Sequence, residues 1–128
     1  MTYLFDTHAL LWLLRAPENL PARVQSITED DSANLVLSIA TPWEMAIKVT
    51  SGKLKVADIL DNFESVATRG RFTLLETTVQ QAIRSGRLPL HHRDPFDRLL
   101  AAQALELRIP IVSQDKIFDR YGVQRIWQ

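Results

Sequence analysis

The sequence contains no cysteine, no long apolar run and no net charge. Without cysteine, disulfide bonds, thiolate chemistry and cysteine-based zinc sites are excluded. No apolar segment approaches the roughly 20 residues that a membrane helix needs, and the first residues lack the basic and apolar regions of a signal peptide. We therefore expect a protein that resides in the cytoplasm and does not enter a membrane.

The absence of net charge bears on nucleic-acid binding. Fifteen lysines and arginines balance fifteen aspartates and glutamates, whereas a protein that holds nucleic acid by overall electrostatic attraction usually carries a basic surplus. Eleven of the fifteen cations are arginines, and the planar arginine side chain donates two hydrogen bonds to one phosphate. The composition therefore permits local phosphate binding without requiring it, and each arginine taken alone also suits a solvated helix face.

Strand and helix patterns alternate along all 128 residues, which suit one domain spanning residues 1–128. The predicted strands are 3–5, 34–38, 72–75, 111–113 and an edge strand near 123–126. The predicted helices are 8–14, 21–30, 41 to about 52, 57–68, 78–85, 96–107 and 117–120. Strands separated by helices pair in parallel through right-handed crossovers, so we expect one α/β sandwich.

Four carboxylates occupy equivalent places on this frame, and we call them the site acids: Asp6, Glu44, Asp97 and Asp115. Asp6 and Asp115 each end a strand predicted to be buried. Glu44 and Asp97 each lie in the first turn of a helix. Because strand ends and the following helix starts share one edge of a parallel sheet, we expect the four to converge there.

Like charges held close together repel one another and need compensation. With oxygen ligands alone, the matching species is a hard cation, Mg²⁺ or Mn²⁺. Such an ion keeps bound water, lowers the pKa of that water and stabilises a phosphate under attack. The acids therefore predict hydrolysis of phosphodiester bonds without a covalent nucleophile or an organic cofactor.

Several of these acids also fit structural roles. Glu44 is the third residue after Thr41 in a capping-box pattern, and Asp97 suits any helix start. Asp94 precedes Pro95 and is the natural N-cap of its helix, so a supporting role at the site comes second for it. Chance convergence of all four site acids is less probable than a structural role for any one of them.

Other polar residues near the acids carry weaker signals. Thr7 and Ser113 are candidates to hydrogen-bond a metal-bound water or a neighbouring acid, and Arg93 and Arg98 are candidates to hold the RNA backbone. His91-His92 suggests a metal pair, but adjacent side chains rarely point the same way, so we interpret the pair as part of a loop. Three tryptophans, Trp12, Trp43 and Trp127, are expected in the core or in an interface.

Four segments resemble, in the family's order, the motifs of PIN-domain proteins of the VapC-like toxin branch: Phe5–Trp12, Trp43–Lys48 with Gly52–Leu54, His92–Ala104 and Val112–Asp115. The resemblance implies a three-layer α/β/α sandwich with a central, mainly parallel sheet. It also implies Mg²⁺- or Mn²⁺-dependent endoribonuclease activity, a homodimer, and inhibition by a small antitoxin protein. By motif, the four site acids become the metal ligands, and Asp97 fits the third position better than Asp94. Ser113 stands where a threonine is common, which keeps the hydroxyl.

Two other classes of protein remain as alternatives. A phosphoacceptor signalling domain also has an acidic, Mg²⁺-binding sheet edge, but it needs paired acids after the first strand and a lysine after the last. Here Asp6 stands alone and Lys116 directly follows an acid. A non-catalytic interaction module suits the neutral charge but leaves the four acids without an explanation.

Overall fold

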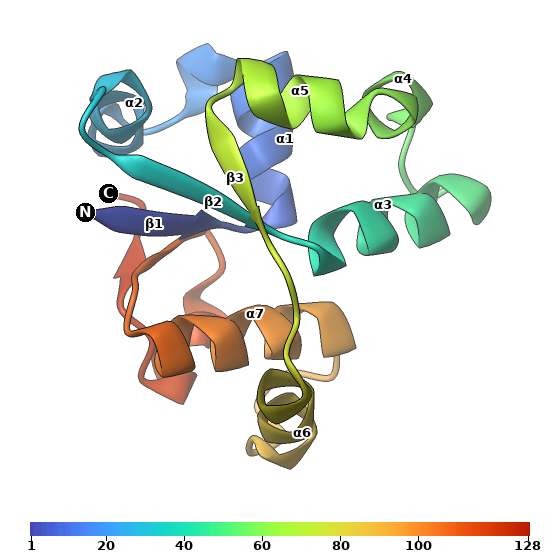
Figure 1. Ribbon diagram of the computed structural model, residues 1–128, viewed down its shortest axis with the longest axis vertical. Coiled ribbons are helices and arrows are strands. Elements are labelled where there is room, and N and C mark those ends of the chain that lie inside the picture. The colour runs from blue at the N-terminus through green and yellow to red at the C-terminus, as the bar shows by residue number, and fades with distance from the viewer.

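In the computed structural model, which describes residues 1–128, five strands form one sheet whose neighbours all run parallel. The strands are β1 (Thr2–Phe5), β2 (Asn34–Ser38), β3 (Phe72–Leu75), β4 (Ile111–Val112) and β5 (Arg125–Ile126). Their order is β3-β2-β1-β4-β5, so β1 lies at the centre (Figure 1). The predicted strands are confirmed, and the sheet expected to be mainly parallel is parallel throughout.

Helices cover both faces of the sheet and complete three layers, which confirms the predicted α/β/α sandwich. The helices are α1 (Thr7–Arg15), α2 (Ala22–Glu29), α3 (Ala40–Thr50), α4 (Ala57–Asp61), α5 (Phe63–Arg69), α6 (Val79–Arg87) and α7 (Pro95–Leu107), with the short 3-10 helices η1 (Pro17–Asn19) and η2 (Lys116–Tyr121). In Figure 1, α1, α2 and α5 lie on one side of the sheet, and α7 lies on the other. No helix has the length and apolarity needed to cross a bilayer.

Side chains of the central strand, β1, belong to two separate hydrophobic clusters. Successive side chains of a strand point to opposite faces, so Phe5 packs with Leu10 and Leu37 on one face of the sheet. Leu4 packs with Leu100 on the other face. Because helices cover both faces, β1 is apolar without alternation, as expected for a central parallel strand.

Three predicted helix boundaries are wrong. The helix expected over 57–68 is divided at Asn62, which lies outside the helical region between α4 and α5. Helix α6 continues past Gly86 to Arg87. Helix α3 begins at Ala40 rather than after Thr41, with Ile39 as its N-cap, and the Ser38 hydroxyl accepts the Ala40 amide 3.1 Å away.

Candidate active site

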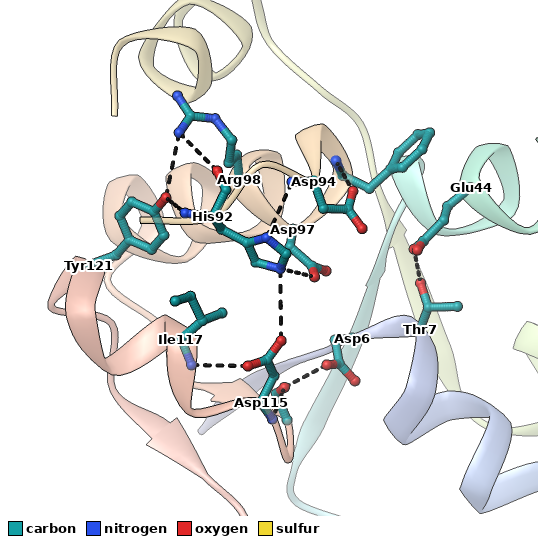
Figure 2. Close-up of polar contacts among 12 residues, drawn as sticks. Asp6, Thr7, Glu44, His92, Asp94, Asp97, Arg98, Asp115, Ile117 and Tyr121 are labelled. Carbon is teal, nitrogen blue, oxygen red and sulfur yellow. Dashed lines mark hydrogen bonds and ion pairs between the residues drawn. The ribbon is translucent and has the colours of Figure 1, made fainter. Parts of the chain in front are cut away.

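The structure brings the four site acids together at the carboxyl edge of the sheet (Figure 2). Asp6 follows β1 as the N-cap of α1, and Asp115 follows β4 as the N-cap of η2. Asp97 lies in the first turn of α7, whereas Glu44, expected in a first turn, lies in the second turn of α3 because that helix begins at Ala40. Each position follows from one feature of a parallel sheet: strands end, and the next helices begin, along the same edge.

Asp6, directly after the central strand, is a buried carboxylate with 5% of its surface exposed. Its Oδ1 accepts the Ala9 amide at 2.8 Å, which caps α1. Its Oδ2 accepts the Ser113 hydroxyl. Burial raises the pKa of Asp6, although the hydrogen bonds from Ser113 and Ala9 oppose that rise. The carboxylate is thus held rigidly where its charge is costly.

Ser113 connects the ends of the two central strands. It is fully buried, and while its hydroxyl donates to Asp6, the same oxygen accepts the Asp115 amide at 3.0 Å. One side chain therefore fixes the position of two site acids that are more than a hundred residues apart in the sequence.

Glu44 does not cap its helix, so the capping-box interpretation is wrong. Its carboxylate accepts the Thr7 hydroxyl at 2.5 Å and forms an ion pair with Lys48, also at 2.5 Å. Both contacts hold the buried Glu44 side chain at the site. Thr41, the residue expected to cap, is buried inside α3 with its hydroxyl unpaired.

Asp97 lies beside a residue that the sequence analysis assigned to a loop. His92 Nε2 is 2.8 Å from Asp97 Oδ2 and 3.8 Å from Asp115 Oδ2. Its neighbour His91 instead packs on the Tyr121 ring, with centroids 5.0 Å apart. The two histidines do point in different directions, as expected, but His92 belongs to the site. Only its place within the third motif could have indicated this.

Asp94 behaves as the N-cap of α7, as expected, since its Oδ1 accepts the Phe96 amide at 2.9 Å. It also stays near the acids, because a ligand atom of Asp94 lies within 4.8 Å of one on His92 and one on Asp97. Asp94 therefore adds negative charge to the site while it begins the helix.

The electrostatics of the site reveal a surplus of negative charge. Burial, followed by the charges of Asp94 and the other site acids, raises the pKa of Asp97 to about 8. The pKa of Lys48 is also raised, which in a lysine favours the charged form. Partial burial would lower its pKa, but the hydrogen bond and charge of Glu44, with the charges of Asp94 and Asp97, raise it. One lysine does not balance the cluster, so the site favours an added cation.

The two arginine candidates lie in different environments. Arg98 is buried, and its guanidinium donates to main-chain carbonyl groups of the segment 85–92, with Ser85, Leu88 and Pro89 within 3.0 Å. That use of its donors argues against the RNA contact expected from the sequence. Arg93 is exposed and makes no hydrogen bond or ion pair.

The tryptophans, expected in the core or in an interface, lie in two kinds of environment. Trp12 and Trp127 stack edge to face with centroids 5.7 Å apart, and Trp127 is buried. Trp43 is 60% exposed and forms an edge-to-face pair with Phe96. It therefore lies on the surface, where only the interface part of the expectation applies to it.

The donor set fits a hard divalent ion. Carboxylates from four elements lie along one edge, ligand atoms of Asp94 and Asp97 lie within 4.8 Å of one another, and carboxylate oxygens are the ligands that Mg²⁺ and Mn²⁺ prefer. The raised pKa of Asp97 gives the physical reason, because a bound cation would offset both the burial and the neighbouring negative charges that favour its protonated form. No sulfur ligand competes, since the chain has no cysteine.

Solved structures resemble this chain over nearly its whole length. VapBC-1 from nontypeable Haemophilus influenzae has a TM-score of 0.70 at 19% identity, covering 98% of this chain and 97% of that chain. VapBC2 from Rickettsia felis, bound to a promoter DNA fragment, has a TM-score of 0.71 at 14% identity with 100% coverage of both. FitAcB from Neisseria gonorrhoeae has a TM-score of 0.62 at 19% identity, covering 97% and 96%. At these identities the likeness shows a shared fold.

Sequence comparison supplies the family. No curated protein matches the chain significantly. The family profile described as PIN domain, however, matches residues 3–124, which include all four site acids. This chain belongs to the PIN-domain family.

Proposed function

We propose that this chain is a metal-dependent endoribonuclease, the toxin of a toxin–antitoxin pair, that hydrolyses phosphodiester bonds in single-stranded or loop regions of RNA. The observation that carries the proposal is the meeting of four carboxylates from four distant segments, with the pKa of Asp97 raised to about 8 by burial and neighbouring acids. Membership in the PIN-domain family supports the same chemistry.

The site acids would hold Mg²⁺ or Mn²⁺. A bound ion would supply an activated water and neutralise charge on the phosphate. The chain's own residues keep the ligands in place. Ser113 holds Asp6, while Thr7 and Lys48 hold Glu44. These contacts orient the carboxylates before any ion or substrate arrives, which lowers the cost of ordering them during the reaction.

The RNA backbone needs cations that are free to bind it. Arg93, directly before Asp94, and Lys116, directly after Asp115, are exposed and without hydrogen-bond partners. Two such cations beside an acidic site suit local phosphate binding in a chain of zero net charge. We assign the backbone contacts to these two residues and a structural role to Arg98.

The proposed partners are a small antitoxin protein and a second copy of the chain, both in the cytoplasm. The similarity to VapBC and FitAcB structures supports an antitoxin. Exposed apolar residues on helix α6 support the presence of a second copy. Helix α6 packs on α7 through buried Gln81 and Ser85, while Val79 and Ile83 are 76% and 49% exposed. Its apolar side therefore faces away from its own protein.

The apolar side of α6 adjoins a similar surface of α3. Ile39, Trp43 and Ile47 are exposed at four-residue intervals along α3, and a groove of about 370 Å³ separates the two helices. We call these exposed side chains of α3 and α6 the α3/α6 face. Exposed apolar side chains on both sides of a groove are typical of an interface.

Charge favours a second copy as the occupant of the α3/α6 face. A twofold axis through the face would pair two α6 helices in antiparallel fashion. Glu76, just before α6, would then lie opposite Arg84 and Arg87 of the other copy, and all three side chains are exposed. The helix thus carries complementary charges at its two ends.

Cleavage of a mixed set of structured RNAs tests the proposed activity. Wild type should cut with Mg²⁺ or Mn²⁺ and stop cutting with EDTA. Asp6→Asn, which keeps the capping oxygen but removes the charge, should bind the ion poorly and leave RNA intact. Asp61→Asn, at an exposed acid of α4, is the matched control and should cut like wild type. Failure of wild type to bind either ion or to cut any RNA would contradict the proposal.

A further inference from the structure

His92 bridges two site acids that belong to different elements. Its Nε2 lies 2.8 Å from Asp97 at the start of α7 and 3.8 Å from Asp115 before η2 (Figure 2). The side chain is about three-quarters buried. No other side chain contacts acids from both elements.

The ring orientation of His92 is fixed by its other nitrogen. The Asp94 amide lies 3.2 Å from Nδ1 and can only donate, so Nδ1 must accept. In the neutral ring the proton is then on Nε2, which donates it to Asp97. A nitrogen that carries a proton does not bind a metal ion. His92 therefore faces the acids as a hydrogen-bond donor, although its position close to Asp94 and Asp97 resembles that of a ligand.

The main chain of His92 is held as firmly as the ring. Its amide donates to the Tyr121 hydroxyl at 2.9 Å, and that hydroxyl donates to the Pro89 carbonyl at 2.8 Å. Its carbonyl lies 3.4 Å from the buried Arg98 guanidinium. These contacts place the imidazole over the acids before any ion arrives.

We propose that His92 is a positioning residue that donates through Nε2 to Asp97, and so sets the orientation of this carboxylate and its separation from Asp115 for the proposed ion. The role rests on the proposed function, because it concerns the same site. This role of His92 explains why Arg98 and Tyr121 make several hydrogen bonds to the segment that connects α6 to α7. A donor that orients a ligand without binding the metal typically changes metal affinity by about 10–100-fold when removed.

Two substitutions of His92 test the roles of its two ring nitrogens separately. His92→Asn keeps a polar atom near the Nδ1 position but removes the donor to Asp97, whereas His92→Gln reaches the Nε2 position with an amide N–H. His91→Asn is the control, because that ring packs on Tyr121 and contacts no acid. Mn²⁺ affinity of the full chain, measured by calorimetry, should fall by about 10–100-fold in His92→Asn and stay close to wild type in the other two. Full affinity in His92→Asn, or equal losses in both His92 variants, would overturn the role.

Spectroscopy tests the same role without relying on activity or on a mutation. Nitrogen NMR of the metal-free wild type, at a pH where the ring is neutral, should show the His92 proton on Nε2. Electron spin echo spectra of the Mn²⁺-loaded protein should show no directly coordinated histidine nitrogen. A proton on Nδ1, or a coordinated nitrogen, would overturn the role while leaving the proposed nuclease intact. Absence of Mn²⁺ binding by wild type would overturn both.

Discussion

The Ser113 hydroxyl donates to Asp6 Oδ2 across the ends of the two central strands, and both residues are buried. The same oxygen accepts the Asp115 amide at 3.0 Å. The position of two site acids therefore depends on one hydroxyl group in the core rather than on the loops around it.

Removal of that hydroxyl should weaken the fold and the site together. Ser113→Ala leaves Asp6 Oδ2 and the Asp115 amide without a partner, and a buried unpaired group costs about 1–3 kcal/mol. We expect the free energy of unfolding in urea to fall by about this amount, and Mn²⁺ affinity to fall because the pKa of Asp6 rises further. Ser113→Thr keeps the hydroxyl and is the control. Equal stability of Ser113→Ala and wild type would contradict the contact.

The raised pKa of Asp97 predicts how stability depends on pH without metal. Between the ordinary value of 3.8 and about 8, folded Asp97 keeps a proton that the unfolded chain releases. The folded state binds more protons, so the free energy of unfolding should fall as pH rises through this window and level off above it. Asp6 contributes with the same sign, because burial raises its pKa too.

Urea titrations across that window provide the measurement. Asp97→Asn should make the fall with pH shallower, and saturating Mg²⁺ should do the same in wild type because the ion binds the charged carboxylates. Metal binding near neutral pH should also release protons, which calorimetry in buffers of different ionisation enthalpy detects. An unchanged pH dependence in Asp97→Asn would show that this carboxyl titrates normally.

Substitutions of Arg93 and Arg98 should have separate effects, one on RNA binding and the other on the stability of the fold. Arg98→Met leaves the carbonyls of Ser85 and Leu88 without their donor, so the free energy of unfolding should fall by at least about 2 kcal/mol. Arg93→Ala should change stability by no more than about 0.5 kcal/mol but weaken RNA binding. Its affinity should also depend less steeply on salt, by about 0.7 in the log–log slope for one phosphate contact. A stable Arg98→Met with impaired RNA binding would reverse these assignments.

The α3/α6 face should determine the oligomeric state. Ile83→Glu places a carboxylate in the centre of the proposed interface, where burying it unpaired costs several kcal/mol. Self-association measured by analytical ultracentrifugation should weaken by at least about tenfold, which corresponds to 1.4 kcal/mol. Ser65→Glu adds the same charge at an exposed position of α5 and should leave association unchanged. A monomeric wild type would exclude the second copy as the occupant.

Much of the arrangement of strands and helices was predictable from the sequence, because it depends on local patterns. Short apolar runs ended by an acid or a small polar residue marked the strands, and Asp94-Pro95 marked the start of α7. Once the strands are parallel, their ends share an edge, so the neighbourhood of Asp6 and Asp115 followed from strand order alone. The capping pattern at Thr41 misled, because α3 already begins at Ala40 and the Glu44 carboxylate accepts the Thr7 hydroxyl.

The sequence by itself determined the alternation of strands and helices and the acids that end them, since propensity and hydrophobic period act over a few neighbouring residues. Only the tertiary structure decided how side chains from separate segments use their hydrogen bonds. Arg98 became a structural donor because the 85–92 segment folds over it, and His92 entered the site because Tyr121 and Arg98 hold its main chain. The outward apolar side of α6 arose because buried Gln81 bonds Gln103 of α7. Such choices depend on long-range contacts that no local pattern encodes.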